Sequence, residues 1–446
     1  MKEREAAIEI VKTLQKNGHQ AVFAGGCVRD AIMNMPVNDI DIATDATPAQ
    51  VEAIFTKTIP VGKQFGVIIV QANSFEFEVA TFRNDIGSDG RRPGAVEFSS
   101  MEEDAKRRDL TINSIFLDPV TGELFDFVGG EEDIANKRIR FVGDPKKRIE
   151  EDFLRILRAV RFKSRFEDFS MEASASMAIL MLKHKLKQNV SIERIKAELD
   201  KMLLTKKPSR AFETMRELKL LDVILPDLAR LVGNKHSAKW HQEGDVWQHT
   251  MIVLDNTREM TDDLNTLWSA LMHDFGKPAT ARDNGKGDIS NHGHDDLGAE
   301  LSDMILNRFK ASNKDREEIV WLVAQHMRIK NAHKMRKAKL FRLVDHDSIE
   351  KLITLGTADS MASQAIDPAL NTDKFAWKEF LMKIKEERGF KLPEPLLDGT
   401  KLIVLGFTPG PAFKNILEKV RSAQLDGKLT NRKEAEEFVK KNFSVE

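Results

Sequence analysis

Two aspartates near the start of the chain, Asp39 and Asp41, are spaced so that their carboxylates can bind one metal ion. Residues two apart on a β-strand point to the same side, so both carboxylates would face one way while Ile40 and Ile42 face the core. Clustered carboxylates supply the hard oxygen ligands that Mg²⁺ prefers, and the remaining positions go to water and substrate phosphates. Such an ion can activate an attacking hydroxyl and stabilise a departing pyrophosphate. Taken alone, the pair is more often a solvated strand end beside a turn.

A turn with two adjacent glycines precedes the aspartates, in the segment AGGCVRD at 24–30, which we expect between a strand and a helix. Gly25 and Gly26 let backbone N–H groups approach a phosphate closely, and Arg29 can add a charge-assisted hydrogen bond. Glycine pairs are common at turns, so the order of the motifs carries more weight than any single one. Gly-Gly, twelve residues and then Asp-x-Asp resembles the signature of the polymerase-β-like nucleotidyltransferase superfamily.

The segment EDFLRILRAVR at 151–161 predicts a helix with a charged stripe, on which Asp152 and Arg155 are followed by Arg158 and Arg161. Cytosine and adenine both present an amine donor beside a ring-nitrogen acceptor, which a carboxylate and a guanidinium can pair with. Uracil and guanine place a carbonyl against the carboxylate instead. One Asp/Arg pair can therefore select C and A and reject U and G by leaving buried polar groups unpaired. An ordinary surface helix with ion pairs is the alternative interpretation.

Four further motifs lie in order between the two aspartates and this predicted helix: FR at 82–83, DGRRP at 89–93, RRDLTIN at 107–113 and DFVGG at 126–130. With the motifs above, they resemble the successive motifs of class II tRNA nucleotidyltransferases and of the related bacterial poly(A) polymerases. The resemblance covers nearly half of the chain, and the ordered set is highly specific.

The resemblance implies a role for each matched residue and a nucleotide-binding set that includes the glycine turn. A loop matching 82–98 is needed in the family to add A after CC, and here Ser88 stands where an aromatic residue is expected. The implied roles are catalysis and Mg²⁺ ligation for Asp39 and Asp41, base selection for Asp152 and Arg155, triphosphate contacts for Arg108 and Arg158, and a ribose contact for Asp109. The full nucleotide-binding set is Gly25, Gly26, Arg29, Arg108, Asp109, Asp152, Arg155, Arg158 and Arg161.

The second half of the chain holds histidines and aspartates with the order of a metal site. The pair His273-Asp274, followed by Gly276-Lys277, resembles the HD phosphohydrolase superfamily, whose ligands come from separate helices. Mixed imidazole and carboxylate ligands suit Mn²⁺, Ni²⁺ or Co²⁺ better than Mg²⁺. The resemblance implies 2′-phosphodiesterase, 2′-nucleotidase and phosphatase activities, and a degenerate domain kept for RNA binding is the alternative. The predicted ligands are His249, His273, Asp274, His294, His326 and Asp359.

Composition indicates a soluble protein of several domains: 446 residues, 41% hydrophobic and 31% charged. The charged N-terminus predicts no signal peptide, no apolar run is long enough to span a bilayer, and one cysteine, Cys27, fits the cytoplasm. A net charge of -1 neither indicates nor excludes RNA binding, because local patches make phosphate contacts. The sequence contains 26 Phe and no Tyr, which nothing in it explains.

These patterns predict an α+β protein with a polymerase-β-like head, built on a mixed sheet with helices, followed by an all-α remainder. We expect 192–228 to complete the nucleotide pocket as part of the family's neck. The basic run 330–339 and the Gly/Pro turn at 405–411 are candidate contacts for the tRNA backbone, although a solvated face explains the first equally well. The predicted domains are a head at 1–140, a neck carrying the base-selecting helix at 141–235, an HD domain at 236–365 and a helical tRNA-binding tail at 366–446.

The predicted function is template-independent addition of C, C and A to the tRNA 3′ end, with CTP, ATP and tRNA as partners and no membrane. Phosphohydrolase activity on tRNA ends is predicted for the HD domain. A poly(A) polymerase has the same head but no HD domain, so the histidine set argues against it. A phosphohydrolase that uses the head only to dock RNA is disfavoured by Asp39, Asp41, Asp152 and Arg155. The oligomeric state is not predicted.

Overall fold

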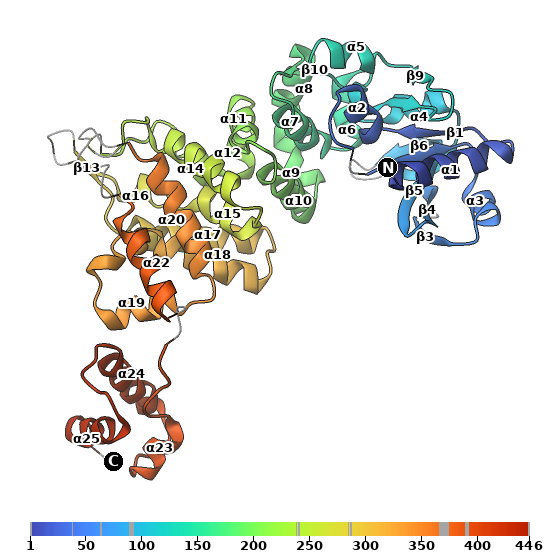
Figure 1. Cartoon of the computed structure of the whole chain (residues 1–446). Coiled ribbons are helices and arrows are strands. Elements are labelled where there is room, and N and C mark those ends of the chain that lie inside the picture. The colour runs from blue at the N-terminus through green and yellow to red at the C-terminus, as the bar shows by residue number, and fades with distance from the viewer. Residues whose placement is uncertain are drawn as a thin grey trace. The chain divides into compact units, whose positions relative to one another are not determined.

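The computed structural model describes residues 2–37, 39–62, 65–88, 93–237, 239, 241–283, 285, 288–364, 374–388 and 392–444. The chain forms two compact units, Met1–Pro226 and Asp227–Glu446 (Figure 1). The predicted head and all but the last residues of the predicted neck lie in the first unit, and the predicted HD domain and tail lie in the second. All five tryptophans of the sequence belong to the second unit, so the first unit has neither Trp nor Tyr.

The first unit is built on a seven-stranded mixed sheet in the order β3-β4-β5-β2-β1-β8-β9. Strands β2 and β5 pair in parallel, and the other neighbours pair antiparallel. The result confirms the predicted mixed sheet of an α+β head. The strands are β1 Ala21–Ala24, β2 Asp41–Thr44, β3 Thr58–Gly62, β4 Val67–Ala72, β5 Phe75–Thr81, β8 Ile115–Leu117 and β9 Leu124–Asp126.

Helix α1 (Lys2–Lys16) packs on this sheet because its apolar residues recur three and four apart. Its buried Ile10 and Leu14 share one core with Phe23, Ile42 and Val79 of the strands. The head has four further short helices: α2 Gly26–Ile32, α3 Pro48–Ile54, α4 Met101–Arg107 and α5 Gly130–Ala135. β1 ends and β2 begins at the predicted site, so this core positions both sides of it.

The segment 82–98, predicted as a mobile loop, is a hairpin of β6 (Arg83–Ser88) and β7 (Pro93–Phe98). Residues 89–92, which carry most of the DGRRP motif, lie outside the described residues. The backbone register runs from Arg83 opposite Phe98 to Ser88 opposite Pro93.

The neck is helical, and the helix predicted at 151–161 is wrong over three residues, 152–154. Helix α6 (Pro145–Glu151) stops at Asp152, whose backbone is extended, and α7 (Arg155–Arg165) starts three residues later. Oδ1 of Asp152 accepts a hydrogen bond from the N–H of Leu154 at 3.0 Å. Aspartate side chains compete in this way with helical backbone bonding, so the periodicity of 151–161 overstated the helix.

The remaining elements are short helices, together with a two-residue parallel pairing. They are β10 Arg138–Ile139, β11 Ser170–Met171, α8 Ala173–Leu182, α9 Leu186–Asn189, α10 Ile192–Leu203, α11 Ser209–Glu217, α12 Leu221–Ile224 and α13 Pro226–Ala229. Of these helices, α10 and α11 pack against α7, and α8 packs against α6.

The second unit is a bundle whose helices supply the predicted metal ligands: α14 Val246–Met260, α15 Leu264–Met272, α17 His294–Arg308, α18 Asn313–Ile329 and α20 Ile349–Ala362. No helix in the described part of the chain is long and apolar enough to cross a membrane. The other elements are α16 Lys277–Thr280, β12 Arg282–Asp283, β13 Ile289–Ser290, α19 Lys337–Val344, α22 Ala376–Arg388, α23 Gly399–Val404, α24 Pro411–Leu425 and α25 Arg432–Asn442. The last three helices bury a core of their own, which contains Leu402, Ile416 and Val439.

Candidate functional site

A polar pocket of about 700 Å³ in the first unit brings together every residue predicted for the head site. Five lining residues were missed by the sequence prediction: Arg107, Asn113, Phe162, Arg165 and Lys201. Arg107 and Asn113 lie at the ends of the RRDLTIN motif, and Arg165 continues the helical stripe of Arg158 and Arg161. Local spacing therefore could have found these three, whereas Lys201 comes from α10 and carries no local signal.

The two aspartates reach the pocket from the start of β2. Asp41 is the first residue of the strand, while Asp39 precedes it, so the two do not share a strand as predicted. Both nevertheless line the pocket. Partial burial, with the negative charges of Glu78 and Asp39, raises the pKa of Asp41, and the charge of Arg108 opposes this. A divalent cation would relieve that repulsion, so these carboxylates fit the Mg²⁺ site that the sequence predicts.

The glycine turn joins β1 to α2 directly beside the aspartates. Gly25 has φ 73°, a backbone conformation that glycine adopts without strain. A Cβ atom at this position would lie 3.0 Å from Nη1 of Arg108, so a side chain would crowd that arginine. The turn therefore needs glycine both for its conformation and for its close approach to a cationic wall.

Arg29 lines the pocket wall, but its side chain is only 2% exposed. Its Nε donates to Oδ1 of Asp30 at 2.8 Å, and its Nη1 donates to the side chain of Asn113. The guanidinium also lies over the ring of Phe162, 5.0 Å from the centroid. These contacts favour a supporting role for Arg29 over the direct phosphate contact that we expected.

Arg155 is the first residue of α7, and its guanidinium is held by acceptors from three places in the chain. Nη1 donates to Oε2 of Glu151 at 2.5 Å and to the backbone oxygen of Arg148 at 2.8 Å. Nη2 donates to the backbone oxygen of Arg107 at 3.1 Å. Because the guanidinium is fixed before any ligand binds, its remaining donors have a defined direction.

Asp109 and Arg158, predicted to contact ribose and triphosphate, pair with one another. Nε of Arg158 donates to Oδ2 of Asp109 at 2.6 Å. Asn113 and the N–H of Leu110 donate to Oδ1, at 3.2 and 2.8 Å. Burial raises the pKa of Asp109, but the charge of Arg158 and these hydrogen bonds outweigh it and hold that pKa well below its usual range. Asp109 is thus a buried carboxylate that keeps Arg158 in place.

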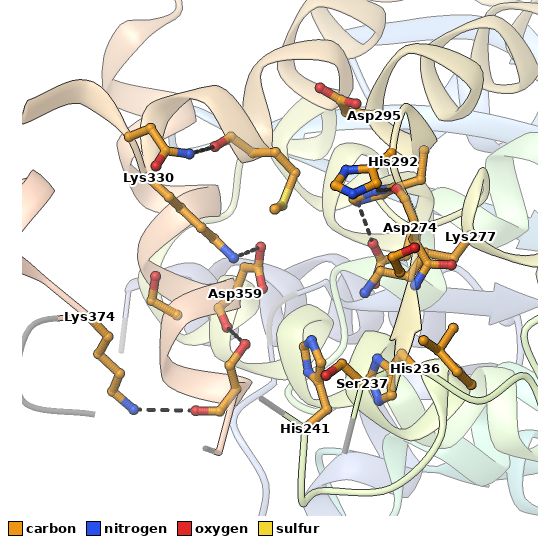
Figure 2. Close-up of a pocket in the computed structure, with 18 of the residues that line it drawn as sticks. His236, Ser237, His241, Asp274, Lys277, His292, Asp295, Lys330, Asp359 and Lys374 are labelled. Carbon is orange, nitrogen blue, oxygen red and sulfur yellow. Dashed lines mark hydrogen bonds and ion pairs between the residues drawn. The ribbon is translucent and has the colours of Figure 1, made fainter. Parts of the chain in front are cut away.

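In the second unit, the predicted ligands come together from separate helices, and three of them, Asp274, His294 and Asp359, line a pocket of about 1130 Å³ (Figure 2). Nε2 of His249 lies 3.2 Å from Asp359 and 3.8 Å from Asp274. Asp274 lies 3.2 Å from Nε2 of His273 on one oxygen and 3.5 Å from Nε2 of His294 on the other. Two overlapping groups result: His249, His273 and Asp274, and Asp274, His294 and His326.

Three of the rings are oriented by the backbone of their own segments. Nδ1 of His273, His294 and His326 lies 2.8, 2.6 and 2.6 Å from a backbone oxygen three residues earlier. A carbonyl can only accept, so each Nδ1 carries the proton and each Nε2 presents its lone pair to the centre. Burial lowers the pKa of His294 and His326, which keeps both rings in the neutral, metal-binding form.

His249 is oriented by a carboxylate, which the sequence prediction missed. Its Nδ1 lies 2.7 Å from Oε1 of Glu243, a side chain only 1% exposed. The same oxygen lies 2.8 Å from Nδ1 of His241, and that ring stacks on His236 with 3.8 Å between centroids. Glu243 precedes the helix by a few residues, outside any ligand spacing. Carboxylate–histidine contacts of this kind are typical of metal sites.

One further observation supports the binding of a transition metal by these histidines and aspartates. Nε2 of His273 is buried and, among the described residues, makes no hydrogen bond. Lys277 lies 2.7 Å from Asp274, and Lys330 lies 2.5 Å from Asp359, so both carboxylates already have a cationic partner (Figure 2). A buried imidazole nitrogen without a hydrogen-bond partner, beside carboxylates that attract cations, is the environment that a bound metal completes.

Comparison with known proteins places these two sites in one family. Three family models match the chain: a poly A polymerase head domain at 21–140, a probable RNA and SrmB-binding site of polymerase A at 168–231, and an HD domain at 246–362. Sheet, pocket and helical bundle therefore define a nucleotidyltransferase joined to an HD domain.

The chain is 30% identical over 433 residues to the CCA-adding enzyme of Streptococcus pyogenes serotype M5, covering 96% of this chain and 94% of the relative. It belongs to the CCA-adding enzymes. The CCA-adding enzyme of Bacillus pumilus is 46% identical over 226 residues, which are 50% of this chain and 56% of that one. The chain thus aligns with about half the length of the first curated relatives it matches. The crystal structure of the Bacillus stearothermophilus CCA-adding enzyme with CTP has 27% identity and a TM-score of 0.73, covering 98% of this chain and 96% of that one.

Proposed function

We propose that this protein adds C, C and A to the 3′ end of tRNA, using CTP and ATP without a nucleic-acid template. The observation that supports this most strongly is the meeting of a carboxylate pair and an Asp/Arg pair in one pocket, Asp39 with Asp41 and Asp152 with Arg155. The solved relative with CTP supports the same nucleotide class. A single cysteine and the nature of the substrate support a cytoplasmic location.

The chain's residues divide the reaction between them. Asp39 and Asp41 would hold Mg²⁺, which supplies Lewis-acid activation of the attacking 3′-hydroxyl and neutralises the departing pyrophosphate. Arg108 and Arg158 bind the triphosphate, and Asp109 fixes Arg158 through the 2.6 Å contact while its edge faces the ribose. The glycine turn allows the phosphates to approach the backbone.

Base selection falls to Asp152 and Arg155. The carboxylate of Asp152 accepts from the exocyclic amine, and the fixed guanidinium of Arg155 donates to the ring nitrogen. Since Glu151 and two backbone oxygens already hold Arg155, a base that offers a donor at this position cannot be accommodated by rotating the side chain. Both C and A fit, and U and G leave polar groups unpaired.

The test uses tRNA that lacks its last three nucleotides, with each labelled NTP alone and in combination, and sizing of the products. We expect CC from CTP alone, CCA from CTP with ATP, and little product from UTP or GTP. Asp39→Ala and Asp41→Ala should abolish addition while circular dichroism shows an unchanged fold. Near wild-type addition by either variant would refute the metal assignment, and long A tracts from ATP alone would favour a poly(A) polymerase.

We further propose that the second unit is a metal-dependent phosphohydrolase that acts on tRNA ends. The convergence of His249, His273, Asp274 and Asp359 favours this, with His294 and His326 available for a second ion. Mn²⁺, Ni²⁺ or Co²⁺ held there would polarise a phosphate oxygen and lower the pKa of a bound water. A 2′,3′-cyclic phosphate ties up the 3′-hydroxyl that the first unit needs, and a 2′-phosphate places a charged group directly beside it. Removal of either group therefore prepares the end for nucleotide addition.

The hydrolase proposal is tested on 2′,3′-cyclic and 2′-phosphate nucleotides with the full chain loaded with each metal. Chelator should abolish hydrolysis, and one of the three metals should restore it. The double variant His273→Ala, Asp274→Ala should lose hydrolysis and keep nucleotide addition, because Asp39 and Asp41 belong to the other unit. Absence of hydrolysis with every metal would show that the domain is degenerate.

A further inference from the structure

Helix α10 contributes to the nucleotide pocket through charged side chains that share one helical face. Arg194, Glu198 and Lys201 are four and three residues apart, the spacing of neighbours on a helix surface. Lys201 lines the pocket, and Glu198 accepts from Nε of Arg161 at 2.7 Å. Helix α10, about forty residues further along the chain, therefore holds Arg161 of α7 in place.

The first residue of this face, Arg194, binds the carboxylate that reads the base. Its Nη2 donates to Oδ2 of Asp152 at 2.7 Å. The other oxygen, Oδ1, accepts from the N–H of Leu154 at 3.0 Å. The contact with Leu154 lies within the turn that carries Asp152, whereas the contact with Arg194 comes from a separate helix. Together they fix the plane of the carboxylate.

The exposure of this ion pair argues against a mainly stabilising role. The side chains of Arg194 and Asp152 are 29% and 22% exposed, and partly exposed ion pairs contribute little to folding free energy. The orientation of the carboxylate matters more. Asp152 interrupts the backbone between α6 and α7, so its own segment gives its side chain less support than a helix interior would.

We propose that Arg194 is a positioning residue for base selection, which acts by fixing Asp152 so that its acceptor faces the exocyclic amine of C or A. The proposal rests on the proposed nucleotidyl transfer. A fixed acceptor rejects U and G because their carbonyl meets an oxygen that cannot turn away. Without Arg194, the carboxylate can rotate toward water, and a carbonyl-bearing base meets a smaller penalty.

The experiment measures kcat/KM for CTP and for UTP with full-length Arg194→Gln and a tRNA that lacks CCA. We expect the CTP-to-UTP selectivity to fall about tenfold, the scale of one hydrogen bond to a charged group. The tRNA dissociation constant should stay at the wild-type value. Arg194→Lys should recover part of the selectivity, because an ammonium can still bind one carboxylate oxygen.

Lys196→Gln is the matched control, because Lys196 pairs with Asp200 at 2.8 Å on the same helix. Those side chains are 24% and 21% exposed, and neither residue lines the pocket. Selectivity should be unchanged in this control. Wild-type selectivity in Arg194→Gln, or an equal loss in both variants, would overturn the proposal. If the wild-type protein adds no CTP to tRNA, the proposed function fails instead, and the two failures are thereby distinguished.

Discussion

Replacing Arg158 with Met tests whether the ion pair with Asp109 holds the nucleotide pocket together. The change keeps an apolar side chain of similar length and removes the guanidinium, which lies over the ring of Phe162 and donates to the buried carboxylate at 2.6 Å. Breaking a buried ion pair costs about 3–5 kcal/mol, because one charge remains without its partner. Arg158 is 33% exposed and Asp109 keeps two other donors, so the cost should be about 2–3 kcal/mol.

For a unit of this size, each kcal/mol lowers the unfolding temperature by about 2–4 °C, so Arg158→Met should unfold roughly 4–12 °C lower. Far-UV circular dichroism follows both units, while tryptophan fluorescence reports the second unit alone. Only the unfolding temperature of the first unit, which tryptophan fluorescence does not report, should fall in Arg158→Met. Lys137→Met, which removes an exposed pair with Asp168, should shift neither transition.

The pH dependence provides a second test of the same pair. In the wild-type protein Arg158 holds the pKa of Asp109 below its unfolded value, so the pair's contribution is present above about pH 3.9 and is lost as the pH falls further. In Arg158→Met, burial without a cation should raise that pKa, and protonation then relieves the buried charge. The difference in unfolding temperature between Arg158→Met and the wild type should therefore become smaller from pH 7.5 toward pH 4.5. The reasoning would be refuted if this difference in unfolding temperature stayed constant over the range. It would also be refuted if the unfolding transition followed by tryptophan fluorescence shifted in the variant.

Three other perturbations have defined outcomes. Gly25→Ala should cost about 1–3 kcal/mol of stability and lower kcat/KM for CTP, since the left-handed backbone and the crowded Arg108 both resist a Cβ atom; unchanged kinetics would contradict the close approach. Shortening 85–95 should leave CC addition intact and stop A addition, and equal loss of both would make the hairpin merely structural. Glu243→Gln should weaken Mn²⁺ binding by about tenfold or more in calorimetric titration, because His249 loses its carboxylate partner; an unchanged dissociation constant would remove Glu243 from the site.

The structure brings together the residues that the sequence motifs singled out for each of the two sites. These residues could be found because they lie close to each other in the chain or follow a recognised order. The sequence predicted their partners poorly. Glu243 and Arg194 act through contacts with residues on other elements, and neither has a spacing that marks it. The helix at 151–161 was overextended because periodicity records which residues share a face, and the backbone break at Asp152 depends on a local side-chain bond. The sequence also gives no sign that the Arg29 side chain is buried against the ring of Phe162, because that burial is a tertiary property.

The backbone contacts of the histidine rings determine when the second unit becomes able to bind metal. For His273, His294 and His326, ring orientation is set locally, by a carbonyl three residues earlier in the chain, which for His294 lies in the turn before α17. Convergence of the Nε2 atoms, by contrast, requires α15, α17 and α18 to pack together. An isolated helix can offer one correctly turned ligand but no chelate. Metal affinity is therefore a measure of helix packing in this unit, and added metal should raise its unfolding temperature in proportion to the logarithm of metal concentration.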